Sequence, residues 1–180
     1  ALLTALPIIP TAAQQSLATD NALTGCRMEI EGSSIPSNAE SLFDGDESTI
    51  FHLDNATSAS MIFTLAQPWY VHGVNLVAGE NMDMAPTKVS LYGLDEETGA
   101  WKAITRTGSA VSIEMPFANG TVRASAVGKA YATFKVEITA IANSTSLELA
   151  ELQLMGIPVT DNAISTRENG TYLMPAFAEN

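Results

Sequence analysis

Short segments in which apolar and polar residues alternate follow one another along most of the chain. An alternation with a period of two is typical of a strand that has one face in a core. Turn-forming residues separate the segments at a spacing of roughly eight to twelve residues, which is typical of a β-sandwich or barrel. The sequence therefore predicts an all-β fold, a β-sandwich with about eight main strands and minimal helix. The predicted strands cover residues 26–30, 61–65, 69–77, 88–93, 101–105, 111–115, 121–125, 133–138 and 147–155.

Helix is expected only as a short element. No segment keeps a helical period, so no helix longer than two turns is predicted. One helical turn is predicted over residues 38–43, with Ser37 or Asn38 as its cap. After Gly156 the alternation fades. We therefore expect a β-sandwich module over residues 22–157, preceded by a signal-peptide remnant or linker (1–21) and followed by a tail or the start of a linker to another domain (158–180).

The first fourteen residues carry no charge and end in small side chains. Thr11 and Ala13 fit the two small positions before a signal-peptide cleavage site. An edge strand or an interdomain linker is the alternative interpretation. No stretch of the sequence approaches the roughly 20 apolar residues of a membrane span. These features favour a secreted, periplasmic or cell-surface protein that does not insert into a membrane.

The charge balance limits the classes of partner. The net charge is −12, with only 8 Lys and Arg residues and a pI near 4.3. So few cations cannot follow a phosphate backbone, which argues against nucleic acid, and the acidic surface favours cations as ligands. Cys26 is the only cysteine. An internal disulfide and a cysteine-based zinc site are therefore excluded, and Cys26 is expected to be a small buried apolar residue.

An oxygen-rich turn is the strongest chemical signal in the chain. Asp44 and Asp46 flank Gly45, and the hydroxyl residue Thr49 follows. Hard cations such as Ca²⁺ prefer carboxylate, hydroxyl and carbonyl oxygens. Glu151, far along the chain, could close the cage from the other end of the fold. The pattern predicts a cation site that ties two ends of the domain together; a solvated acidic turn without a metal is the alternative.

The same carboxylates could in principle form the acid/base pair of a glycosidase. Such a pair needs one carboxyl group with a raised pKa in a cleft that holds sugar. Adjacent carboxylates in a hydroxyl-rich turn instead favour a cation, which keeps them ionised. The sequence also has no Gly-x-Ser-x-Gly, His-Glu-x-x-His or phosphate-loop motif. We therefore expect a protein without catalytic activity.

The order of the segments resembles coagulation factor 5/8 type C (discoidin-like) domains and family 32 carbohydrate-binding modules of secreted bacterial proteins. The resemblance implies a galactose-binding-like jelly roll. Animal members of the family usually carry a cysteine pair, which this chain lacks, so the bacterial branch fits better. The matching segments, in family order, are residues 42–52, residues 63–74 with Trp69, residues 86–93 with Trp101, residues 131–138 and residues 150–156.

The resemblance also implies a structural Ca²⁺ ion where the Asp-Gly-Asp turn meets the last strand. Every side-chain position of the family's metal site has a matching residue here. The implied ligands are the side chains of Asp44, Asp46, Thr49 and Glu151 and the backbone carbonyls of Ser41 and Ala150.

By family position, several loops form an end of the domain at which a sugar would bind. Sugar recognition needs directional hydrogen bonds and an apolar platform. The platform would be Phe117, or Met82 with Met84. Sugar-binding members present an Arg and an exposed aromatic residue before the strand at Pro86, and residues 79–85 contain neither. The candidate ligand residues are His52, Asn55, Glu80, Asn81, Asp83 and Phe117.

The sequence thus predicts a secreted or surface carbohydrate-binding module, stabilised by Ca²⁺, that attaches a larger protein or a cell surface to a glycan or polysaccharide. The alternative is an architectural or protein-interaction module that keeps the jelly roll and has no sugar site. Polar loops without any ligand would agree with that alternative. A protein partner or a flanking catalytic domain is compatible with either interpretation.

Overall fold

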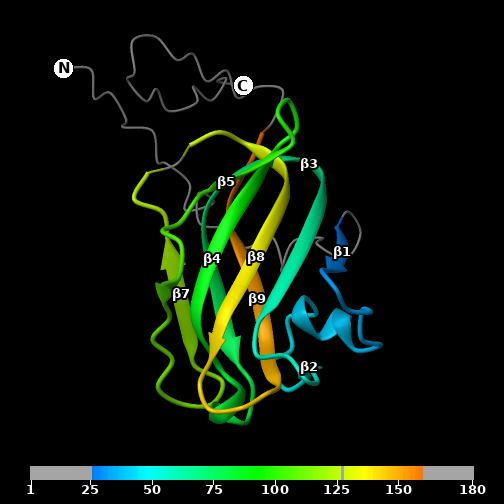
Figure 1. Ribbon diagram of the computed structural model, residues 1–180, viewed down its shortest axis with the longest axis vertical. Helices are drawn as coiled ribbons and strands as arrows, with labels where there is room; N and C mark the ends of the chain where they lie inside the picture. Colours follow the sequence, from blue (N-terminus) through cyan, green and yellow to red (C-terminus); the bar gives the residue numbers. More distant parts are fainter. Residues whose placement is uncertain (1–25, 127, 160–180) are drawn as a thin grey trace, which may run out of the picture.

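A computed structural model describes residues 26–126 and 128–159 of the chain (Figure 1). The described residues form two 3₁₀ helices, η2 (Ala39–Leu42) and η3 (Met82–Met84), and nine strands. The segments predicted as a signal remnant and as a tail lie almost entirely outside the described residues. Within the described residues, no helix is long and apolar enough to cross a membrane. The strands are β1 (Arg27–Ile30), β2 (Phe51–Leu53), β3 (Ala59–Ala78), β4 (Pro86–Asp95), β5 (Ala100–Ala103), β6 (Ser109–Ala110), β7 (Asn119–Arg123), β8 (Tyr131–Ile141) and β9 (Leu147–Pro158).

Strand β3 joins the two layers of the sandwich. Its first part, residues 59–64, pairs with β8 and β1, and its second part, residues 69–78, pairs with β9 and β7. A register shift lies between Thr64 and Trp69. The sequence predicted two strands here, and the structure has one strand of 20 residues because the backbone stays extended through the irregularity. Strands β4, β5 and β6 extend the first layer and β2 extends the second; every pairing is antiparallel.

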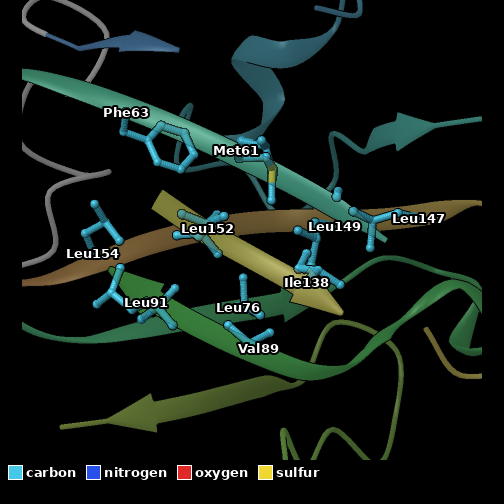
Figure 2. Close-up of a cluster of buried hydrophobic side chains, with 14 of the residues drawn as sticks. Met61, Phe63, Leu76, Val89, Leu91, Ile138, Leu147, Leu149, Leu152 and Leu154 are labelled. Carbon is cyan, nitrogen blue, oxygen red and sulfur yellow. The ribbon is translucent and has the colours of Figure 1, made fainter. Parts of the chain in front are cut away.

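The core lies between the layers and consists mainly of the inward-facing residues of four long strands (Figure 2). Burial of each such side chain contributes about 1.5–3 kcal/mol, so this cluster is the main source of stability. The all-β sandwich predicted from the alternation is confirmed. The labelled core residues are Met61, Phe63 and Leu76 of β3, Val89 and Leu91 of β4, Ile138 of β8, and Leu147, Leu149, Leu152 and Leu154 of β9.

The strand predicted over residues 111–115 is wrong. This segment pairs with β4 only through β6 (Ser109–Ala110). One more backbone bond follows, from Val111 N to Thr87 O (2.9 Å), and the segment then leaves the sheet. A side chain on Gly120 would meet Val111 Cγ1 at 2.4 Å and Ile113 Cγ1 at 2.5 Å. The alternation of these two apolar residues therefore reflects a loop that covers β7, which sequence alone does not distinguish from a strand.

The predicted helical turn is confirmed as η2. Asn38 occupies the N-cap position but makes no side-chain capping bond. Its Nδ2 atom instead donates to Ile50 O at 2.8 Å, which holds the helical turn against the start of β2. Leu42 and Phe43, at the end of this turn, are buried in the core. The segment between η2 and β2 is therefore fixed at both ends, and it contains the Asp-Gly-Asp turn.

Cys26 packs against the edge of the core and is half-buried, less than the sequence predicted. Burial raises the pKa of its thiol to about 11. A thiol with so high a pKa stays protonated at neutral pH and is a poor nucleophile. Cys26 therefore acts as a small apolar residue, as the sequence suggested.

Candidate functional site

The Asp-Gly-Asp turn is organised by its own side chains. Gly45 has φ +74°, a left-handed conformation that favours glycine. The carboxylate of Asp44 accepts two bonds, from Asp46 N to Oδ1 at 2.9 Å and from Thr49 Oγ1 to Oδ2 at 2.6 Å. The turn therefore brings the side-chain oxygens of Asp44 and Thr49 together.

A β-bulge in β9 directs Glu151 toward this turn. In the pairing with β3, Val77 lies opposite Glu151 and Ala78 lies opposite Leu149, so Ala150 is an extra residue. A bulge of this kind shifts the alternation of side chains along a strand. Leu147 and Leu149 face the core before the bulge, and Leu152 and Leu154 face it afterwards. As a result, Glu148 and Glu151 both lie on the opposite face of β9.

Glu151 is 2% exposed, and neither of its carboxylate oxygens has a hydrogen-bond partner. Burial raises the pKa of this carboxyl group to about 7. The negative charge of nearby Asp44 also raises the pKa. The backbone N–H groups of Gly45 and Asp46 lie close enough to lower it, but neither meets the geometry of a hydrogen bond to Glu151. A buried carboxylate without a partner is costly unless a cation or a proton neutralises it.

Asp46 is oriented differently from Asp44. Its Oδ1 atom accepts bonds from Ser48 N at 3.0 Å and Ser48 Oγ at 2.6 Å, and these bonds lower the pKa of its carboxyl group. Among the described residues, no group of three or more His, Cys, Asp or Glu side chains could hold a metal ion. The ligands of a cation at this turn would therefore include Thr49 and backbone carbonyls in addition to the carboxylates of Asp44 and Glu151. Ser41 lies in η2 and Ala150 lies beside Glu151 in β9.

The second cluster of predicted residues surrounds His52 on β2. His52 lies opposite Glu148 in the pairing of β2 with β9. Its Nδ1 atom is 3.2 Å from Glu148 Oε1, and its Nε2 atom is 3.0 Å from Asp54 Oδ1. Glu148 is only 16% exposed, and its Oε2 atom also accepts a bond from Asn81 N at 3.1 Å. Glu148 therefore connects His52 to the loop before β4.

That loop is held close to β9 and to the turn between β8 and β9. Asn81 Oδ1 accepts a bond from Asp83 N at 3.1 Å and caps η3. Asp83 O accepts a bond from Asn143 N at 2.8 Å. A side chain on Gly79 would lie 2.8 Å from Glu148 Cβ, so the backbone approaches β9 closely there. Glu80, between these contacts, is exposed.

Asn55 and Phe117 lie in loops next to this cluster, and both have unusual backbone conformations. Their φ angles are +52° and +59°, the only positive values at non-glycine positions among the described residues. Such conformations carry a strain cost and are common at binding sites. Ala118 O accepts a hydrogen bond from Ala78 N at 3.2 Å, and this bond places the loop that contains Phe117 beside Gly79. Phe117 is 39% exposed.

The candidate ligand residues therefore gather at one end of the sandwich, which we call the ligand end. Figure 1 shows it at the bottom, where β2 lies near the turn between β8 and β9, away from the β4–β5 hairpin. The ligand end comprises His52, Asp54, Asn55, Glu80, Asn81, Asp83, Phe117 and Glu148.

Solved structures with a similar fold include carbohydrate-binding modules. A family 32 module of NanJ from Clostridium perfringens, solved in complex with galactose, superposes with a TM-score of 0.56 at 15% identity, covering 72% of this chain and 93% of that one. A module from the same organism, solved with GalNAc-β-1,3-galactose, gives a TM-score of 0.56 at 15% identity and covers 78% and 99%. An F5/8 type C domain from Bacteroides fragilis gives 0.61 at 11% identity and covers 74% and 93%. This chain has the family 32 module and F5/8 type C fold.

No protein-family model and no curated protein matches the sequence. At this level of identity, the similarity to family 32 modules extends to the fold and leaves the ligand open. The resemblance of the motifs predicted the same fold, and that prediction is confirmed.

Two residues of the ligand end, Asp54 and Glu148, were not among the predicted site residues. Glu148 alternates with the core residues Leu147 and Leu149, which identifies it as an outward-facing residue of a strand. Its contact with His52 follows from the register between β2 and β9, which the sequence does not specify. Asp54 could have been found, because it lies two residues after His52 and just beyond the end of β2.

Proposed function

We propose that this chain is a non-catalytic carbohydrate-binding module that binds a glycan at the ligand end. The observation that carries the proposal is the convergence of the six ligand residues predicted from sequence on one end of the fold. Solved structures with this fold include complexes with galactose and with GalNAc-β-1,3-galactose, and these ligands belong to those proteins. The convergence gives a sugar both hydrogen-bonding groups and an apolar surface.

Each type of residue at the ligand end has a role in such a complex. Asn55, Asn81 and the carboxylates supply directional hydrogen bonds to hydroxyl groups. The exposed ring of Phe117 offers an apolar surface to the face of a pyranose ring. Backbone bonds join the segment 78–85 to Ala118 and to Asn143, and Asn81 N donates to the Glu148 side chain. The site is therefore largely formed before a ligand arrives.

A structural Ca²⁺ ion at the Asp-Gly-Asp turn is the second part of the proposal. It is supported by the two buried, unpartnered oxygens of Glu151 beside the oxygens of Asp44 and Thr49. The carbonyls of Ser41 and Ala150 would complete an oxygen shell, and Asp46 would join it only by turning its carboxylate away from Ser48. The ion would supply positive charge that keeps Glu151 ionised and connects the turn to β9. Its role is in stability, and no chemical step depends on it.

We also propose a secreted or surface location, in which the module attaches a larger protein to a glycan. The alternative, an architectural or protein-interaction module, is favoured by two observations. Residues 79–85 contain no Arg and no aromatic residue, and both ring nitrogens of His52 already face carboxylates. The two functions therefore differ in whether the ligand end contacts sugar.

Retention by glycans tests the first function. On affinity gels and a glycan array containing galactose, hexosamine and uronate glycans, we expect the protein to bind at least one class. Phe117→Ala should weaken binding about two- to tenfold, since an aromatic contact is worth about 0.5–1.5 kcal/mol. Met115→Ala is a matched control, because Met115 lies in the same loop and is 62% exposed. An absence of retention on all three classes, with and without Ca²⁺, would favour the architectural alternative.

A further inference from the structure

One glutamate joins two segments of the ligand end that are far apart in the sequence. Glu148 lies on β9 opposite His52 of β2, and its carboxylate also reaches the loop before β4. We infer that Glu148 is a positioning residue, which sets the place of Asn81 relative to His52 without contacting the glycan itself. This inference rests on the proposed function and assigns a residue that holds its site together.

Both carboxylate oxygens of Glu148 have contacts within the protein. Oε1 lies 3.2 Å from His52 Nδ1, and Oε2 accepts a hydrogen bond from Asn81 N at 3.1 Å. The Glu148 side chain is only 16% exposed, whereas that of Asp54 is 79% exposed. A covered carboxylate with both oxygens in contact is poorly placed to bond a sugar hydroxyl, so Glu148 acts through its neighbours.

The absence of a side chain at position 79 makes this arrangement possible. A Cβ atom on Gly79 would lie 2.8 Å from Glu148 Cβ and 3.0 Å from Glu148 Oε2. The backbone of β9 fixes the Glu148 Cβ atom, so this atom cannot turn aside as the end of a flexible side chain could. A larger residue at position 79 would therefore push the loop away from β9.

The loop before β4 has two attachments, and Glu148 provides the one nearest the candidate ligand residues. The far end of the loop is held by the backbone bond from Asn143 N to Asp83 O at 2.8 Å. The near end carries Glu80 and Asn81, and its bond to the protein is the one from Asn81 N to Glu148. Loss of the Glu148 side chain should therefore release the near end and leave the far end in place.

Hydrogen exchange of the ¹⁵N-labelled protein, followed by NMR spectroscopy, tests the positioning role without a ligand. In Glu148→Ala we expect the Asn81 amide to exchange about tenfold faster, while the Asn143 amide keeps its rate. Gly79→Ala, which pushes the same loop off β9 by steric contact, should accelerate the same amide. Glu137→Ala is the matched control, because Glu137 is also a strand glutamate with a hydrogen-bonded carboxylate, and it lies on β8 in the other layer.

Calorimetric titration with the glycan found in the retention experiment tests the effect on binding. Glu148→Ala should weaken binding about tenfold, because the hydrogen bond to a charged group that places Asn81 is lost. Glu148→Gln should weaken it only about threefold, since the glutamine oxygen still accepts the bond from Asn81 N. Glu137→Ala should bind as tightly as the wild-type protein.

The two measurements separate this inference from the proposed function. An Asn81 amide that keeps its wild-type exchange rate in Glu148→Ala would overturn the inference, whichever ligand binds. Glycan binding by Glu148→Ala at the wild-type affinity would also overturn it and would leave the proposed function in place. If the wild-type protein binds no glycan, the proposed function fails, and hydrogen exchange alone decides whether Glu148 positions the loop. Should Glu148→Ala fail to fold, Glu148→Gln and Gly79→Ala provide the same comparison.

Discussion

Addition of 10 mM Ca²⁺ to chelator-treated protein is expected to raise its melting temperature by about 3–10 °C. Extracellular modules bind Ca²⁺ with dissociation constants of about 10⁻⁴–10⁻³ M, so this concentration stabilises the fold by about 1.4–2.7 kcal/mol. The physical reason is that the proposed ion would neutralise Glu151, whose two oxygens are buried without partners. Differential scanning calorimetry with and without EDTA measures the effect.

Asp44→Ala is expected to lower the melting temperature in the presence of Ca²⁺ and to abolish the response to the ion. Because Asp44 also accepts bonds from Asp46 N and Thr49 Oγ1, the variant loses some stability even without metal. The Ca²⁺-induced change is therefore the quantity to compare. Glu47→Ala is the matched control, since Glu47 is exposed in the same turn and outside the proposed shell. A melting temperature of the wild-type protein that neither EDTA nor Ca²⁺ changes would show that this turn binds no stabilising ion.

The sequence predicted the fold well where a pattern is set locally. The alternation of apolar and polar residues located β4, β8 and β9, because each of these strands has one face in the core. It failed over residues 111–115, where Val111 and Ile113 cover Gly120 from a loop. Burial of alternate residues is a property shared by strands and by extended loops, so the pattern alone could not separate the two.

In the candidate sites, too, contacts between residues close in sequence could be predicted, and contacts between distant residues could not. The Asp-Gly-Asp turn could be predicted because its bonds join residues at most five positions apart. The resemblance to known domains was needed to bring in Glu151, and the bulge at Ala150 that orients it has no signature in the sequence. The contact between His52 and Glu148 depends on strand register, which is a property of the whole sheet.

The bulge also explains how one strand serves both sites. Without the extra residue Ala150, Glu148 and Glu151 would lie on opposite faces of β9. With it, both point away from the core, Glu151 toward the Asp-Gly-Asp turn and Glu148 toward His52. The short strand β2 follows that turn directly and carries His52. The proposed ion would therefore hold the segment that positions the ligand end.

Glu151→Gln is expected to stabilise the metal-free protein at pH 8 and to change how stability depends on pH. Burial raises the pKa of Glu151 from 4.5 to about 7, so the folded state holds this proton more strongly than the unfolded state. The metal-free fold is therefore most stable below pH 4.5 with respect to this group. It loses stability as the pH rises to about 7 and is constant above that. A pKa difference of one unit corresponds to about 1.4 kcal/mol, so the cost at pH 8 is on the order of 3 kcal/mol.

Urea denaturation of the two proteins from pH 4.5 to pH 8, in EDTA, measures this dependence. The wild-type protein should lose stability across the range relative to Glu151→Gln, because the glutamine has a similar shape and no charge to bury. Glu47→Gln, an exposed change in the neighbouring turn, should keep the wild-type slope. With 10 mM Ca²⁺ present, the advantage of Glu151→Gln at pH 8 should shrink by about 1.4–2.7 kcal/mol, because the ion stabilises the ionised carboxylate and gains little from an amide. A variant that is less stable than the wild-type protein in EDTA at pH 8 would show that Glu151 is compensated without a metal.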